Sequence, residues 1–312
     1  MSFARTVKKE LVSIPVNRDE MLAELSAFLD MAVDIIIRDR KRVLTFKTNN
    51  PAIAQRFIKL IKTLYQADVN LITKKEVSLS QKDSIIIEVI SEVDKIINEH
   101  DLLGDTIAAS ELITQEPSAK KAYIRSAFLV SGSINHPKTA EYHMEIYSED
   151  ADHIVFIQSL INYFGLNAKI TKRRKGYIAY LKEAAAISDF IQLMGAINAV
   201  FQFEDVRIKR DFNNSINRVI NCEIANQQKT IEASAEQIKD IEFILSRLSK
   251  NFIDDKMQET IDLRLKYPDA SLRELTERYE EMYGKKITRS GLNHRIKKIR
   301  ETVLELKEGK HD

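Results

Sequence analysis

The order of secondary-structure signals in the first lobe of the sequence returns about one hundred residues later, and this repetition constrains the fold most. A helical stretch with Ser26-Ala27-Phe28-Leu29 precedes strand-like and helical segments, and the same order follows Ser126-Ala127-Phe128-Leu129. A four-residue match between two helices can arise by chance, but the order of the elements repeats as well. The sequence therefore predicts an α+β fold with two duplicated lobes, at residues 1–115 and 116–212.

Hydrophobic periodicity gives the expected elements of each lobe. The first lobe is expected to have a helix around 21–29, a strand at 43–48, a helix from Pro51 to Leu64, and strands at 69–72 and 84–90. The second is expected to have a helix at 122–130, a strand at 143–148, a helix at 151–164, strands at 168–171 and 176–181, and a closing helix at 184–199.

Residues 223–250 read as one long polar helix within a linker at 213–253. Four apolar residues follow a seven-residue spacing, Ile224, Ile231, Ile238 and Leu245, and a second row contains Ala235, Ile241 and Leu248. Such a stripe requires a partner surface. The helix is either a connector that packs on the rest of the chain or one strand of a coiled-coil dimer, and we favour the connector and a monomer.

Residues 254–312 are expected to form an all-α unit. Met257, Ile261 and Leu265 mark a first helix that ends before Pro268. Ser271 and Glu274 have the spacing of a capping box for a second helix, which Gly284 is expected to end. Thr288 is the expected N-cap of a third helix with an apolar face of Leu292, Ile296, Ile299 and Val303. This order is typical of a helix-turn-helix.

The charge of the last helix favours double-stranded DNA as its partner. Residues 284–300 contain seven Lys or Arg and no acid, whereas residues 256–282 contain five basic and seven acidic residues. A recognition helix places Arg and Asn side chains on base edges, while Lys and Arg contact phosphates. The alternative is a solvated basic face on a three-helix bundle. The predicted DNA contacts are Ser271, Arg273, Lys285, Lys286, Thr288, Arg289, Ser290, Asn293, His294, Arg295, Lys297, Lys298 and Arg300.

A second basic region lies in the second lobe, where the turn Lys172, Arg173, Arg174 and Lys175 supplies four of the six basic residues between His153 and Lys182. A weaker cluster in the first lobe comprises Arg38, Arg40, Lys41 and Arg42. Two basic clusters related by the duplication would suit a saddle-shaped surface that binds across a DNA duplex. A hairpin that only increases solubility explains the turn equally well.

Several classes of protein are excluded by the residues that the sequence lacks. It contains no GxGxxG, no GxxxxGK[ST] and no HExxH motif, and its single cysteine permits no intramolecular disulfide and no cysteine-rich zinc module. No window resembles a transmembrane helix, and the N-terminus lacks the apolar core of a signal peptide. We therefore expect no cofactor, no metal, no membrane partner and a cytoplasmic, nucleoid-associated location.

Two sets of residues resemble known families. The helices expected at 23–35 and 122–134, each followed by strands and helices, resemble the paired helices of the LAGLIDADG homing-endonuclease fold. The stretch from Asn217 to Thr230, with Ser290-Gly291-Leu292-Asn293-His294-Arg295, resembles the WhiA family of bacterial regulators. That resemblance covers essentially the whole chain. It implies a transcriptional regulator linked to cell division, chromosome segregation and, in spore formers, sporulation, with the transcription machinery or another regulator as a further partner.

The sequence departs from the nuclease pattern at the acid positions. These positions fall near Ala32 and Ser131; Asp30 and Asp34 lie near the first, but residues 117–140 contain no carboxylate. Cleavage with divalent metal needs carboxylates to hold the cations. The sequence therefore predicts a non-cleaving scaffold and no enzyme, with an active DNA endonuclease, or an interaction scaffold with incidental DNA affinity, as the alternatives.

Overall fold

The computed structural model of this chain describes residues 2–74, 84–248 and 252–308. It divides into two compact units, residues 1–211 and 212–312, which are described separately below. Helix α9 (Ile197–Arg247) begins in the first unit and ends in the second. In the described part of the chain, no helix is both long enough and apolar enough to cross a bilayer.

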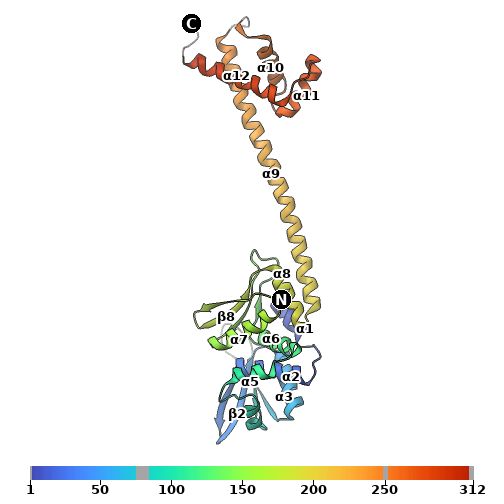
Figure 1. Ribbon diagram of the computed structural model, residues 1–312, viewed down its shortest axis with the longest axis vertical. Helices are drawn as coiled ribbons and strands as arrows, with labels where there is room; N and C mark the ends of the chain where they lie inside the picture. Colours follow the sequence, from blue (N-terminus) through green and yellow to red (C-terminus); the bar gives the residue numbers. More distant parts are fainter. Residues whose placement is uncertain (1, 75–83, 249–251, 309–312) are drawn as a thin grey trace. The chain divides into compact units, whose positions relative to one another are not determined.

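The first unit contains one arrangement of elements twice, which confirms the duplicated α+β fold (Figure 1). Helix α1 (Phe3–Leu11) precedes the first repeat and α5 (Thr106–Ile113) connects the two. The first repeat comprises α2 (Arg18–Ala32), β1 (Val33–Arg38), β2 (Lys41–Thr48), α3 (Pro51–Tyr65), β3 (Val69–Lys74), β4 (Ser84–Val89) and α4 (Val93–Glu99). The second comprises α6 (Pro117–Ser131), β5 (Ser133–Ile134), β6 (Met144–Ser148), α7 (Ala151–Tyr163), β7 (Lys169–Arg173), β8 (Gly176–Leu181) and α8 (Ala184–Met194).

Each repeat forms a four-stranded antiparallel sheet, in the orders β1-β2-β4-β3 and β5-β6-β8-β7. The core of the first repeat joins α2, β2 and α3 through Phe28, Phe46 and Phe57, with 4.5 Å between the ring centroids of Phe46 and Phe57. Helices α2 and α6 pack against each other, and both contain fully buried alanines such as Ala23 and Ala122. Small side chains let the two helices approach closely, so the repeats share one core.

A buried ionic cluster also joins the two repeats. Glu24 of α2 is fully buried and lies between two arginines, with Arg56 Nη2 at 2.7 Å and Arg125 Nη1 at 2.8 Å from its carboxylate oxygens. Arg125 of α6 also donates through Nε to the carbonyl of Met194, and Arg56 of α3 donates to the carbonyl of Ile14. Because all three charges are removed from water, each depends on the others for stability.

Several helix boundaries differ from those expected from the sequence. The paired helices end at Ala32 and Ser131, not at 35 and 134, because β-branched residues from Val33 onward enter the sheet as β1. The closing helix expected at 184–199 ends at Met194, because Gly195 adopts a left-handed conformation with φ of 95°. Helix α9 then runs without a break from Ile197, although the sequence predicted a separate helix only from 223. Helices α1, α4 and α5 were not expected.

The second unit packs the end of α9 with three helices, α10 (Asp255–Lys266), α11 (Leu272–Tyr283) and α12 (Arg289–Lys307). The predicted caps are present. Ser271 and Glu274 form a capping box, Gly284 ends α11 with φ of 64°, and Thr288 Oγ1 accepts a hydrogen bond from the Gly291 amide. The helix-turn-helix layout therefore has the local structure that the sequence indicates.

The apolar face of α9 agrees only in part with the predicted one. Ile224, Ile231 and Leu245 of the first row and Ala235 of the second are exposed. Ile241 of the second row is buried against α10 and α12, as is Ile244, which the prediction did not include. In α10, Leu263 is buried and the expected core residue Leu265 is exposed. A seven-residue spacing marks one possible face of a helix, but the partner elements decide which face is buried.

Candidate nucleic-acid interface

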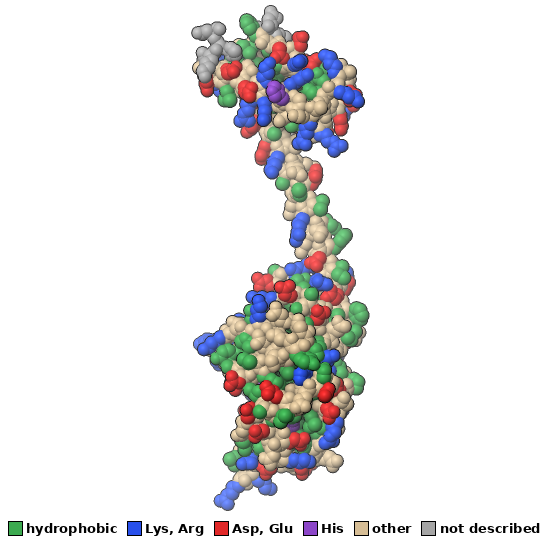
Figure 2. All heavy atoms as spheres, viewed as in Figure 1, with side chains coloured by type: hydrophobic (Ala, Val, Ile, Leu, Met, Phe, Trp, Pro, Cys, Tyr) green, Lys and Arg blue, Asp and Glu red, His purple; other side chains and the backbone are tan. Residues whose placement is uncertain are grey.

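The outer side of α12 carries most of the polar residues predicted to contact DNA. Leu292, Ile299 and Val303 are buried, and they fix the rotation of the helix about its axis. Arg289, Ser290, Asn293, His294, Lys297, Lys298 and Arg300 are all exposed. Figure 2 shows Lys and Arg side chains gathered on the visible face of this unit. The arrangement is open to a large anionic partner.

Ion pairs divide the exposed cations of this region into two sets. Five pair with carboxylates: Lys298 Nζ lies 2.7 Å from Asp254, Arg300 3.2 Å from Glu236, Lys285 3.1 Å from Glu259, Lys286 3.6 Å from Glu280 and Arg273 3.7 Å from Glu277. Arg289 and Lys297 have no carboxylate partner among residues 2–74, 84–248 and 252–308. Four of the five pairs are exposed on both sides and contribute only about 0–1 kcal/mol each, so a phosphate can replace the carboxylate in them, whereas the Glu259 partner of Lys285 is half-buried.

Arg295 points into the unit and not away from it. Its Nη1 donates to Tyr279 Oη at 3.1 Å and lies 3.2 Å from Glu259 Oε2, and its guanidinium lies over the Tyr279 ring. Tyr279 itself donates to Glu259, and this hydrogen bond is the largest cause that lowers the pKa of the Glu259 carboxyl. The DNA contact predicted for Arg295 stays a prediction, with a structural role for the same side chain beside it.

A pocket of about 240 Å³ lies where the first turns of α11 and α12 meet α9. Its lining includes three predicted DNA-contacting residues, Ser271, Arg273 and Arg289, together with two that the sequence reasoning did not select, Lys229 and Arg264. Four of these five are cations, and no acidic side chain lines the pocket. Helix N-termini and cations both favour anions, so the pocket is suited to a phosphate.

Arg264 is a buried cation in the lining of this pocket. Its side chain is 2% exposed and no carboxylate pairs with it in the described parts of the chain. Its Nη1 donates to the carbonyl of Ala270 at 2.6 Å and to Ser234 Oγ at 3.2 Å, and its buried Nε has no hydrogen-bond partner there. Burial lowers the pKa of Arg264. Only the fold could reveal this site, because Lys229 and Arg264 lie on different helices.

The second predicted DNA surface is the turn between β7 and β8. Lys172, Arg173, Arg174 and Lys175 are exposed, and Arg173 Nη2 lies 3.1 Å from Glu145. Neither Arg174 nor Lys175 is paired with a carboxylate of the described chain. The turn therefore presents unpaired positive charge, as the sequence indicated.

The weaker basic cluster does not occupy the equivalent position in the first repeat, which corrects the expectation of two clusters related by the duplication. Arg38 to Arg42 lie at the β1–β2 turn, which corresponds to the β5–β6 connection. The equivalent of the β7–β8 turn falls on residues 75–83, outside the described residues. Arg38 is also held by two hydrogen bonds to Glu88, at 2.7 and 2.8 Å.

The ends of the paired helices do not offer the ligands that a nuclease needs. Ser131 Oγ donates to the carbonyl of Tyr147, and Asp34 is an exposed residue of β1. The buried carboxylate of Asp30 accepts hydrogen bonds from Tyr123 Oη and Ser110 Oγ, both at 2.7 Å. In the parts of the chain that the structure describes, no group of three or more Asp, Glu, His or Cys has a metal-binding arrangement. The residues present therefore do not fit the divalent cations of that fold family.

Comparisons with known proteins cover almost the whole chain. Residues 18–103 match the WhiA N-terminal LAGLIDADG-like domain, residues 120–213 the WhiA LAGLIDADG-like domain, and residues 216–303 the WhiA C-terminal HTH domain. The "Probable cell division protein WhiA" of Enterococcus faecalis is 41% identical over 311 residues, which cover 99% of both chains. The protein of the same name from Latilactobacillus sakei is 41% identical over 96% of both.

One solved structure shares the fold over nearly all of the chain. It is full-length WhiA from Thermatoga maritima, with a TM-score of 0.59 and 22% identity over 98% of this chain and 99% of that one. A similar relation holds for the separately crystallised N-terminal LAGLIDADG domain of WhiA, with a TM-score of 0.50 and 24% identity over 62% of this chain.

Proposed function

Because this chain belongs to the WhiA family, we propose that it is a sequence-specific regulator that binds double-stranded DNA and does not cleave it. Residues 254–312 would read the DNA site, and residues 213–253 would connect them to the rest of the chain. The lobes at 1–115 and 116–212 would add contacts to DNA or protein. The names of its relatives support a role in cell division, and the family resemblance extends the proposal to chromosome segregation and, in spore formers, to sporulation.

The observation that carries the proposal is the exposed polar surface at the start of α12. Arg289 and Lys297 are exposed without a carboxylate partner in the described chain, and Asn293 lies exposed between them. Arg forms bidentate hydrogen bonds with guanine and Asn with adenine, and a recognition helix reads bases with its N-terminal part. These three residues would therefore read bases in the major groove.

The remaining cations would hold the DNA backbone. Four cations are paired with carboxylates that are exposed or half-buried, and phosphates would replace these carboxylates: Lys285, Lys286, Lys298 and Arg300. The pocket with Arg264 and Lys229 would take one phosphate at the N-termini of α11 and α12. Such contacts fix the register of the recognition helix without reading sequence.

A regulatory role without cleavage is supported by the lack of suitable carboxylates. Ala32 and Ser131 occupy the positions where the nuclease family has acids, and the buried Asp30 is engaged within the core. We place the protein in the cytoplasm at the nucleoid, as a monomer, with the transcription machinery or another regulator as a further partner.

Selection of binding sites from a random duplex library with the full chain tests the proposal. At about 150 mM salt, we expect enrichment of one motif, with a specific affinity at least about 10³-fold above that for random DNA. Affinity that disappears at this salt concentration, with no enriched motif, would indicate a scaffold. Magnesium-dependent cleavage of the selected duplex that is lost in Asp34→Asn would indicate an endonuclease.

A further inference from the structure

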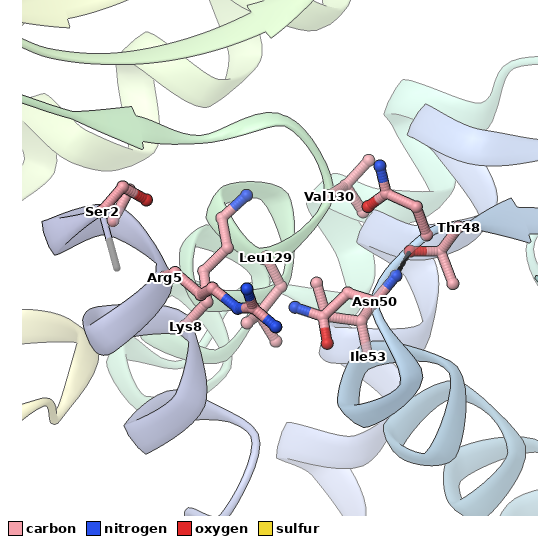
Figure 3. A pocket seen from close by; sticks show the side chains of 10 residues that line it. Ser2, Arg5, Lys8, Thr48, Asn50, Ile53, Leu129 and Val130 are labelled. Carbon is pink, nitrogen blue, oxygen red and sulfur yellow. Dashed lines mark hydrogen bonds between the residues drawn. The ribbon is translucent and has the colours of Figure 1, made fainter. Parts of the chain in front are cut away.

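We propose that the first unit binds a small phosphorylated molecule, of about the size of a mononucleotide, in a pocket between α1, α3 and the end of α6. The pocket has a volume of about 410 Å³ and is lined by polar residues of α1 and of the β2–α3 connection (Figure 3). Small-molecule sites commonly have volumes of about 300–1,000 Å³. This inference does not depend on the DNA-binding function proposed above.

Positive charge dominates the pocket lining. Arg5 and Lys8 of α1 both extend into the space in front of α3 (Figure 3), and no acidic side chain lines the pocket. Within the described ranges, neither cation makes a hydrogen bond or an ion pair. The pocket therefore has two cations whose charge no group of the described chain balances.

Lys8 is the more informative of the two cations. It is partly buried, and its Nζ lies 5.5 Å from the centroid of the Phe128 ring. Burial lowers the pKa of Lys8 to about 8, so the amine is still mostly charged at neutral pH. A partly buried ammonium without a carboxylate costs free energy, and an anion that entered the pocket would remove part of that cost.

Neutral hydrogen-bond donors complete the polar side of the pocket. Asn50 Oδ1 accepts a hydrogen bond from the Ala52 amide at 3.0 Å, which leaves the two N–H donors of its side-chain amide for another partner. Asn49 lies beside it in the lining. Two cations and two amides form a set rich in donors, which suits the several acceptor oxygens of a phosphate group.

The opposite part of the lining is apolar. Ile53 of α3 and Leu129 and Val130 of α6 form it. A base, sugar or hydrocarbon body could pack against these side chains while its phosphate contacts Arg5 and Lys8. A phosphodiester of DNA offers the same oxygens, so the experiment must separate the two sources.

The test uses the full chain and three probes: inorganic pyrophosphate, adenosine monophosphate and adenosine. Binding is followed by calorimetry and by the shift in melting temperature, at constant ionic strength. We expect saturable binding of pyrophosphate and adenosine monophosphate, and none of adenosine alone. Lys8→Met, which keeps the packing on Phe128, and Arg5→Gln, at an exposed position, should each weaken this binding at least tenfold. Lys9→Met, which removes an exposed cation of the same helix outside the pocket, should not.

The unliganded melting temperature shows whether each variant is folded. No saturable binding to either phosphate, or binding that Lys8→Met and Arg5→Gln leave unchanged, would overturn the proposal. A random 20-base-pair duplex is titrated in parallel. Loss of duplex affinity in both variants, with no binding of the small phosphates to the wild type, would assign the pocket to the DNA backbone and would also overturn it.

Discussion

Arg295 Nη1 lies 3.2 Å from Glu259 Oε2, so one of the basic residues of α12 is directed into the second unit and not toward solvent. Only 21% of its side chain is exposed, and Tyr279 of α11 accepts a hydrogen bond from Arg295 and donates one to Glu259. The neighbouring cations Arg289 and Lys297 are exposed and unpaired in the described chain. The cations of α12 are thus of two kinds: Arg295 stabilises the packing of the unit, and Arg289 and Lys297 are available to a ligand.

Arg289→Ala and Asn293→Ala should each lower the affinity for the selected DNA site by about 1–3 kcal/mol and relax base choice at one position. Both side chains are exposed, so neither change should alter folding. Affinities for the selected site and for random DNA give the measurement. Lys298→Ala is the control, because a phosphate contact should weaken both DNAs alike. Equal losses on both DNAs for all three variants would contradict base reading by α12.

Lys229→Gln should weaken binding to specific and random DNA by the same factor, because Lys229 lines the pocket proposed to hold a phosphate. The slope of log affinity against log salt should become shallower by about 1. Lys239→Gln provides a matched change on the same helix, at an exposed lysine outside the pocket. A salt slope identical in the wild type and both variants would exclude Lys229 from the interface.

Arg295→Gln should destabilise the second unit by about 1–2 kcal/mol, because it leaves Glu259 with one fewer charged partner and removes the guanidinium from the Tyr279 ring. Thermal unfolding without DNA gives the measurement. Arg289→Gln, at an exposed and unpaired arginine of the same helix, should leave the melting temperature unchanged. Equal melting temperatures for the two variants would refute a structural role of Arg295.

The buried Asp30 should make the first unit less stable as the pH rises. Burial raises the pKa of Asp30 from its usual 3.8 to about 6. Its contribution is therefore fully present below about pH 4 and is lost as the pH rises through 6. Asn does not titrate, so Asp30→Asn should gain about 2 kcal/mol relative to the wild type between pH 4 and 7.

Urea unfolding of both proteins at several pH values tests this prediction. His100, whose pKa burial lowers to about 4, titrates in both proteins, so its effect cancels in the difference. The pKa of His153 is also lowered to about 4, but His153 shares the hydrogen-bonding Tyr123 with Asp30, so the change below about pH 5 includes both groups. A difference that does not change between pH 4 and 7 would mean that Asp30 titrates with an ordinary pKa.

Glu24→Gln should destabilise the first unit by about 3–5 kcal/mol, because it leaves Arg56 and Arg125 buried beside a neutral side chain. Chemical denaturation of the full chain, followed by a signal from the first unit, measures the change. Glu20→Gln, at a half-buried residue in the first turn of the same helix, serves as the comparison and affects the capping box. A loss no larger than that of Glu20→Gln would show that the buried cluster contributes little.

Short-range signals in the sequence were sufficient to predict the repeated order of elements and the helix-turn-helix. The capping box of Ser271 and Glu274 and the left-handed Gly284 depend on residues within one turn of helix, and the structure confirms both. The lack of carboxylates in residues 117–140 is likewise a property of the sequence alone. In contrast, the ends of the paired helices were placed wrongly, because pairing of β1 with β2 decides where α2 stops.

What the sequence determined by itself is the duplicated α+β lobes, the caps of the last helices and the excess of positive charge on α12, since each follows from neighbouring residues. The tertiary structure decided which face of α9 is buried, that Arg295 turns inward, and that Lys8 meets Phe128 and Lys229 meets Arg264 around separate pockets. These outcomes depend on the free energy of contacts between residues far apart in the chain, which no local pattern of residue types encodes.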